Sequence, residues 1–278
     1  MIAYYNENDP HAAAWLRELI AQRLIADGEV DTRSIEDVLP GDLKGFTQHH
    51  FFAGIGGWSY ALRLAGWSDD RPVWTGSCPC QPFSTAGARG GFADERHLWP
   101  AFYHLVAQCK PATIFGEQVA KALEWVDLVQ TDLEACNYTF GKAVLGAHSV
   151  AAPHIRQRLY WMAQSNSDNH QSAIGPSSGI SKATTIEHGP AVTITGESSG
   201  TSSDVLWEWI EGSDGKTRPI EPGTFPLAHG IPARVVRLRG YGNAIVPQVA
   251  AMFIKSYMEA VIELQNPLTP MLFGNILR

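Results

Sequence analysis

Two cysteines flank a proline in the segment Ser77-Cys78-Pro79-Cys80-Gln81-Pro82, which follows a short apolar run. In doubly wound α/β folds, the carboxyl ends of the strands hold the active site. A cysteine there, on a loop stiffened by prolines, could act as a nucleophile. Two alternatives stand beside this interpretation. One is a small buried hydrophobe; the other is a zinc ligand, although no second Cys or His pair stands at ligand spacing, so we predict no metal site.

An acid and two arginines are the other candidates for chemistry. Glu117 comes just after a second apolar run, so its carboxyl group would lie one strand away from Cys80. The alternative is a helix N-terminal acid favoured by the helix dipole. Arg156 and Arg158 stand two positions apart, and in a strand such residues share a face. The alternative is that both are ordinary solvated or paired arginines.

Two glycine-rich segments could approach a ligand closely. The first follows a buried apolar run, and glycines without side chains let the backbone of such a turn come near a ligand. A purely structural strand-to-helix turn is the alternative. The second precedes the last expected helix. These segments are Phe52-Ala53-Gly54-Ile55-Gly56-Gly57 and Gly240-Tyr241-Gly242-Asn243-Ala244.

Periodicity predicts alternating strands and helices around these candidates. This alternation indicates an α/β fold, with a doubly wound, mainly parallel sheet covered on both faces. Strands are expected at 2–5, 30–35, 49–53, 73–76 and 113–115, and helices at 10–25, 58–66, 98–110, 123–136 and 247–263.

Composition divides the chain into three parts. Residues 165–203 are rich in Ser, Gly, Thr, Asn and His and poor in large apolar side chains, which is typical of a loop-rich insert. We therefore expect one α/β domain at 1–164, a small loop-rich insert at 165–233, and a return to the first domain at 234–278.

Bulk properties limit the class of protein. The 278 residues are 45% hydrophobic, enough for a substantial core, and no apolar run reaches the roughly 20 residues of a membrane span. The beginning of the chain lacks a basic stretch followed by an apolar one, and four cysteines are too few for a disulfide scaffold, so a cytoplasmic protein is expected. The net charge of −7 argues against a nucleic-acid partner, but such binding needs only a local basic patch.

Together these segments resemble the cytosine-5 DNA methyltransferase family. The Pro79-Cys80-Gln81 loop is the most specific element, and the glycine turn precedes it. Glu117, the Arg156 and Arg158 pair, and Gly242-Asn243 follow in family order. This set of motifs is similar to that of small family members from bacteriophages or prophages. The resemblance therefore implies that the protein acts in a bacterial or phage-infected cell. The resemblance implies a Rossmann-like S-adenosylmethionine methyltransferase sheet with a small target-recognition domain.

The resemblance also implies a role for each matching residue. Cys80 would add to C6 of a cytosine flipped out of duplex DNA, and Glu117 would hold the base and supply a proton to N3. Arg156 and Arg158 would orient the base and the nucleophile. The cofactor would be S-adenosylmethionine, bound by Phe52, Ala53, Gly54, Ile55, Gly56, Gly57, Pro79, Leu98 and Asn243.

One departure from the family pattern concerns the remaining cofactor ligands. Family members carry an acidic ribose ligand and an adenine-binding aspartate between the glycine turn and the Pro-Cys loop, where this chain has only about twenty residues. Glu7 and Asp37, each placed after an expected strand before the glycine turn, resemble those two ligands. We therefore hypothesise a local permutation in which two strand-helix units come first. The alternative is a solvated acidic N-terminal segment. Two further departures are Gln118, where the family has Asn, and His154, where it often has Gln.

The resemblance predicts DNA (cytosine-5-)-methyltransferase activity on double-stranded DNA, serving modification against restriction, in a monomer without membrane attachment. Three rivals remain open: a catalytically inactive DNA-binding protein on the same scaffold, a different S-adenosylmethionine-dependent or modified-methyl transfer at C5 of cytosine, and a zinc-dependent binding module.

Overall fold

The computed structural model describes residues 2–79, 98–150, 152, 154–166, 208–211, 217–220 and 244–265. The chain divides into two compact units, one made of residues 1–173 and 235–278 and the other of residues 174–234. The second unit contains an antiparallel hairpin of β8 (Glu208–Glu211) and β9 (Thr217–Ile220).

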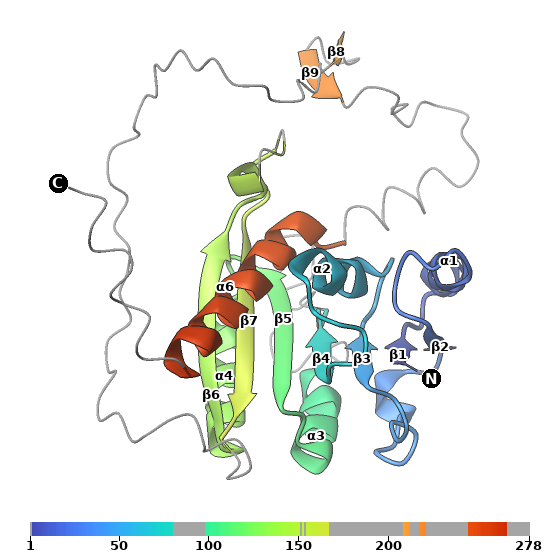
Figure 1. Ribbon diagram of the computed structural model, residues 1–278, viewed down its shortest axis with the longest axis vertical. Helices are drawn as coiled ribbons and strands as arrows, with labels where there is room; N and C mark the ends of the chain where they lie inside the picture. The colour runs from blue at the N-terminus through green and yellow to red at the C-terminus, as the bar shows by residue number, and fades with distance from the viewer. Residues whose placement is uncertain are drawn as a thin grey trace, which may run out of the picture. The chain divides into compact units, whose positions relative to one another are not determined.

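A seven-stranded sheet forms the framework of the first unit, in the order β2-β1-β3-β4-β5-β7-β6 (Figure 1). The five strands from β2 to β5 are parallel, and β7 runs antiparallel to both β5 and β6. The strands are β1 (Ala3–Asn6), β2 (Gly28–Asp31), β3 (Gln48–Phe51), β4 (Val73–Gly76), β5 (Thr113–Val119), β6 (Tyr138–Leu145) and β7 (Arg158–Ser165).

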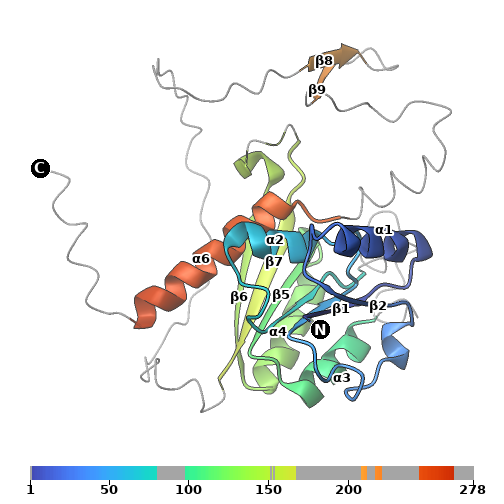
Figure 2. The same cartoon turned by 45° about the vertical axis from the view of Figure 1, so that its right-hand side comes forward.

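Helices cover both faces of this sheet (Figure 2). One face carries α1 (Pro10–Ala21), α2 (Gly57–Ala65) and α6 (Pro247–Gln265), and the other carries α3 (Trp99–Cys109) and α4 (Leu123–Ala135). Short 3-10 turns, η1 (Ile35–Asp37) and η4 (Ala147–Val150), follow β2 and β6. The predicted α/β fold with a doubly wound, mainly parallel sheet is confirmed.

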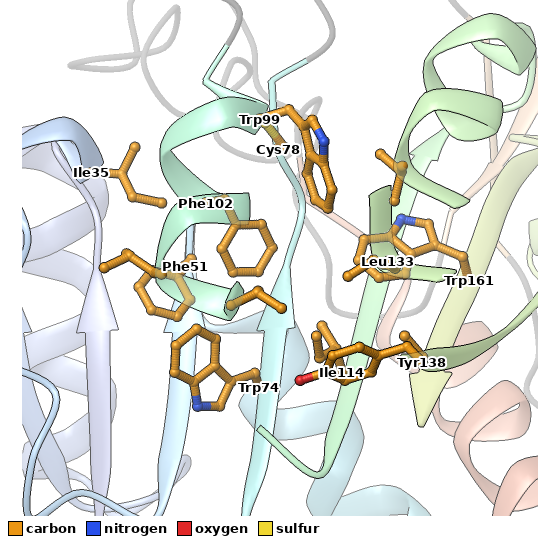
Figure 3. Close-up of a cluster of buried hydrophobic side chains, with 14 of the residues drawn as sticks. Ile35, Phe51, Trp74, Cys78, Trp99, Phe102, Ile114, Leu133, Tyr138 and Trp161 are labelled. Atoms are coloured by element: carbon orange, nitrogen blue, oxygen red, sulfur yellow. The ribbon is translucent and has the colours of Figure 1, made fainter. Parts of the chain in front are cut away.

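Alternation along the strands divides the core into two layers. On β5, Ile114 packs with the α3 and α4 side, while Phe115 packs with α2 and α6. Figure 3 shows the first layer, where Trp99 and Phe102 of α3 lie over the strands. Close approach requires small residues in the strands: a Cβ on Gly116 would stand 2.1 Å from the Trp161 ring.

Some expected boundaries were wrong. The second strand ends at Asp31, and the segment predicted as strand up to residue 35 instead bends at Arg33 and enters η1 at Ile35. Strand β6 was not predicted, and the first helix ends at Ala21 instead of residue 25. Among the described residues, no helix is both long and apolar enough to cross a membrane.

Candidate functional site

The glycine turn joins β3 to α2 at the carboxyl edge of the parallel strands. Phe52, Gly54 and Gly56 have φ values of 52°, 56° and 82°, in the left-handed region. Gly56 is the N-cap residue of α2, and a Cβ on Gly54 would meet no atom within 4 Å. The turn therefore presents bare backbone and the start of a helix to the space above the sheet, an arrangement suited to ligand approach.

Glu7 lies directly beside this turn, at the end of the neighbouring strand β1. Its Oε2 accepts a hydrogen bond from the Gly54 amide at 2.7 Å, and its Oε1 accepts one from the Asp9 amide at 2.9 Å. Each carboxylate oxygen has two lone pairs, so both oxygens keep capacity for a further donor. The half-buried Glu7 thus presents two carboxylate oxygens whose orientation is fixed by backbone amides.

A small cavity of about 30 Å³ opens between the turn and the start of α6. Ser77 contributes a hydroxyl to its wall, and the Trp58 indole Nε1 donates to Ser77 Oγ at 2.9 Å. Gly57 faces Ile245 closely, since a Cβ there would stand 2.8 Å from Ile245 Cγ1. The lining residues are Phe52, Ala53, Gly54, Ile55, Gly57, Trp58, Ser77, Ala244 and Ile245.

The sequence did not mark Ser77 or Trp58 as functional. The position of Ser77 within the Pro-Cys segment was a usable signal, because the end of β4 lies beside the end of β3 in a parallel sheet. Together the Glu7 carboxylate, the bare glycine turn and the Ser77 hydroxyl form a donor and acceptor set that fits a nucleoside-type cofactor such as S-adenosylmethionine.

Glu117 is buried near the end of β5 and is 8% exposed. Arg158 at the start of β7 approaches it, with Nε 2.9 Å from Glu117 Oε1. Burial raises the pKa of Glu117 to about 7, opposed by the charges of Arg158 and Arg156 and by the hydrogen bond from Arg158. A carboxyl group with this pKa holds or releases a proton near neutral pH, which suits general acid chemistry.

Arg156 lies outside the strand, so the prediction that it shares a strand face with Arg158 is wrong. Strand β7 begins at Arg158, and Arg156 has a φ of 28°. Its guanidinium turns instead toward α6, where Nη2 donates to the carbonyl oxygen of Ala244 at 2.5 Å. Burial, and next the charge of Arg158, lowers the pKa of Arg156. Ala244 also lines the cavity. Arg156 therefore bonds to the cavity wall, while its charge acts on the Glu117 carboxyl group.

The other predicted residues divide into described and undescribed ones. Pro79 is half-buried after the buried Cys78, and Leu98 is the N-cap residue of α3 and packs on the core. Asp37 is exposed in η1, and its carbonyl oxygen accepts from Arg33. Cys80 and Asn243 lie outside the described residues, as does most of the expected recognition domain at 165–233.

No cluster of three or more His, Cys, Asp or Glu side chains able to hold a metal ion occurs among the described residues. The buried Cys78 is a core residue, packed with the cluster that contains Phe102 and Trp99. The carbonyl oxygen of Cys78 accepts a hydrogen bond from the side chain of Gln118 at 3.1 Å.

Comparison with known proteins matches the chain to a family of DNA methylases and to type II methyltransferases. The family model described as C-5 cytosine-specific DNA methylase matches residues 68–213. The type II methyltransferase M.NlaX of Neisseria lactamica is 28% identical over 206 residues, 70% of this chain and 59% of that protein. M.AplI of Arthrospira platensis is 30% identical over 95 residues, 33% of this chain and 28% of that protein. M.HhaI of Haemophilus parahaemolyticus is 29% identical over 108 residues, 37% of this chain and 33% of that protein. The chain thus spans less than two thirds of the length of each.

Proposed function

The chain belongs to the C-5 cytosine-specific DNA methylase family, and on that premise we propose that it transfers a methyl group from S-adenosylmethionine to C5 of cytosine in duplex DNA. Its mostly parallel, seven-stranded sheet is typical of the S-adenosylmethionine methyltransferase fold. The observation that carries the proposal is the buried Glu117, which has a pKa of about 7, beside Arg158 and one strand away from the segment that leads to Cys80.

The cofactor would be held along the edge formed by β1, β3 and β4. The Glu7 carboxylate suits the vicinal hydroxyls of a ribose, since both of its oxygens are already oriented by backbone amides. The turn of residues 52–57 and the Ser77 hydroxyl would face the methionine portion, with Pro79, Leu98 and Asn243 completing the pocket and Asp37 at the adenine. S-adenosylmethionine would supply an electrophilic methyl carbon.

The remaining chemistry belongs to the side chains of the chain. The Cys80 thiolate would form a bond to C6 of the flipped cytosine, while protonated Glu117 donates its proton to N3. The electron pair of the C5–C6 double bond would then bond to the methyl carbon, whose bond to the sulfonium sulfur breaks with its electron pair left on sulfur. Loss of the C5 proton to water would restore the double bond and expel the thiolate, while N3 gives its proton back to Glu117. Arg158 and Arg156 would keep Glu117 in place and stabilise the carboxylate that is left after its proton has moved to N3.

We also propose that the chain order of the family is permuted here. Strand β1, which Glu7 directly follows, lies between β2 and β3 in space although it comes first in sequence. The parallel order of these strands and the Glu7 to Gly54 hydrogen bond support this interpretation. The likeness to type II methyltransferases supports a role in protecting DNA from a restriction nuclease.

The decisive experiment incubates the purified chain with unmethylated duplex DNA and S-adenosylmethionine labelled in its methyl group, followed by bisulfite sequencing. We expect label in DNA at C5 of cytosine within one short target sequence. The Cys80→Ala variant should lose transfer entirely, because no other nucleophile is proposed at C6. Cys109→Ala, a half-buried cysteine at the end of α3, is the matched control and should keep wild-type transfer. Transfer by Cys80→Ala would refute the assigned nucleophile.

A further inference from the structure

The buried amide of Gln118 connects the ends of two neighbouring strands. Its Nε2 donates to the carbonyl oxygen of Cys78 at 3.1 Å, and its Oε1 accepts from the backbone amide of Val119 at 2.8 Å. The residue is only 3% exposed. Because both ends of the amide are bonded, the orientation of the side chain is fixed, and so is the atom that it holds.

This bond takes over where the ladder between β4 and β5 ends. The last paired residues of the two strands are Gly76 and Gly116, and the chain beyond Gly76 leaves the strand. Cys78 lies two residues beyond Gly76, as Gln118 lies two beyond Gly116. The side-chain amide of Gln118 therefore takes the place of the next backbone hydrogen bond between the strands. The chain after β4 can turn away from the sheet and still be hydrogen-bonded to β5.

We propose that Gln118 is a positioning residue that fixes the backbone at Cys78 so that the nucleophile, Cys80, reaches C6 of the pyrimidine held by Glu117. The proposal rests on the proposed methyl transfer. Glu117 and Gln118 are consecutive on β5, so one strand would set both the acid and the anchor of the nucleophile loop. Gln118 itself would touch neither the base nor the cofactor. Its effect would be only on the position of the Cys78 backbone and therefore of Cys80.

The test measures covalent capture of the enzyme by duplex DNA carrying 5-fluorocytosine at the target position, in the presence of S-adenosylmethionine. Gln118→Met fills the same volume without the amide. We expect its rate of adduct formation to fall by about 10- to 100-fold, since a displacement on the order of 1 Å has effects of that size. The dissociation constant for S-adenosylmethionine, measured by calorimetry without DNA, should stay within about threefold of the wild-type value, because the Glu7 and glycine-turn contacts are untouched.

The controls separate a positioning role from a general packing role. Gln130→Met changes a half-buried glutamine of α4 whose solvent-exposed hydrogen bond goes to Glu134, and it should leave the adduct rate unchanged. Gln118→Asn keeps the amide but shortens the side chain by one methylene group, so it cannot make both bonds in place and should slow adduct formation by a smaller factor. If the Gln118→Met variant does not fold, the rate of adduct formation by the folded Gln118→Asn variant decides between the two roles.

Three results would overturn the proposal. The first is a folded Gln118→Met variant that forms the adduct at the wild-type rate. The second is a loss confined to cofactor affinity, and the third is a wild-type rate for Gln118→Asn when the methionine variant is unfolded. In each of these the wild-type chain still forms the adduct, so the proposed function stands. A wild-type chain that forms no adduct would overturn both.

Discussion

Two interior strands of the sheet bury neighbouring polar residues, among them His49 and His50 of β3 and Glu117 and Gln118 of β5. All four side chains are less than 9% exposed. The pairs differ in what faces them. His50 stacks on Tyr5 at 4.9 Å between ring centroids and hydrogen bonds to Thr75 at 2.8 Å, whereas Glu117 faces the guanidinium of Arg158 at 2.9 Å.

The same burial therefore has different consequences in the two strands. Burial, and next the charge of His49, lowers the pKa of His50 to about 3, so this side chain stays neutral at any working pH. Burial raises the pKa of Glu117, but the two arginines oppose the rise, and the result is a pKa of about 7. Burial reinforced by a like charge keeps the titratable group neutral, while burial opposed by charges of the other sign brings its proton within reach of neutral pH.

The largest expected effect is on the rate of methyl transfer. Glu117→Gln keeps the shape of the side chain but cannot donate a proton to N3, so the single-turnover rate should fall by about 10²- to 10⁴-fold. His50→Phe keeps a ring that can stack on Tyr5 and should retain a rate close to wild type at pH 7.5. Transfer of labelled methyl under single-turnover conditions measures both. An equal loss of transfer rate in the two variants would contradict the interpretation that Glu117 belongs to the active site and His50 to the core.

A second prediction concerns the dependence of stability on pH. The folded pKa of His50 lies below its ordinary value of 6.5, so the unfolded chain takes up the proton first, and the free energy of unfolding decreases as pH falls below about 6.5. The folded pKa of Glu117 lies above its ordinary value of 4.5, so the folded chain holds that proton from about 7 down to 4.5. Its contribution therefore increases over the same range. The two terms oppose each other, each by at most about 1.4 kcal/mol per pH unit.

Urea denaturation at pH 7.5, 6.0 and 5.0 separates these two terms. Between pH 6.5 and 5.0, removing His50 should abolish a loss of about 2 kcal/mol, so His50→Phe becomes less sensitive to acid than wild type. Glu117→Gln should become more sensitive to acid, because it lacks the compensating term. Parallel profiles for wild type and both variants would contradict the assigned pKa directions.

The sequence predicted the sheet and the site residues to different extents. Glycines, prolines and apolar runs were enough for the parallel strands and for the turn at Gly54, because these depend on local conformation. Arg156 was misplaced because its φ of 28° and its bond to Ala244 depend on a helix about ninety positions later in the chain. Strand β6 was missed because most of its residues are only half-buried or exposed, which leaves no apolar run to detect.

Polar residues in buried strands were the least predictable. In the sequence, the pairs at positions 49–50 and 117–118 look alike, since each follows or precedes large apolar residues. Only the fold brings Arg158 to Glu117, because β7 is inserted antiparallel beside β5. Charge partners supplied from a distant strand are not encoded by local pattern, and they decide which buried pair can exchange a proton.

The smallest expected effect is a shift along the pH axis when one of these partners is removed. Arg158→Gln takes away the nearer opposing charge, so the pKa of Glu117 should rise further and the folded chain should keep its proton to higher pH. The unfolding free energy falls with rising pH until the folded chain has lost this proton, so in Arg158→Gln the fall should continue to higher pH. Urea denaturation between pH 6 and 9 measures this change. Arg158→Lys keeps the charge and should shift less. The double variant with Glu117→Gln supplies the baseline, since the transition should be absent there. An unchanged midpoint in Arg158→Gln would mean that burial alone sets the pKa of Glu117, and β5 would then differ from β3 only in the type of residue that it buries.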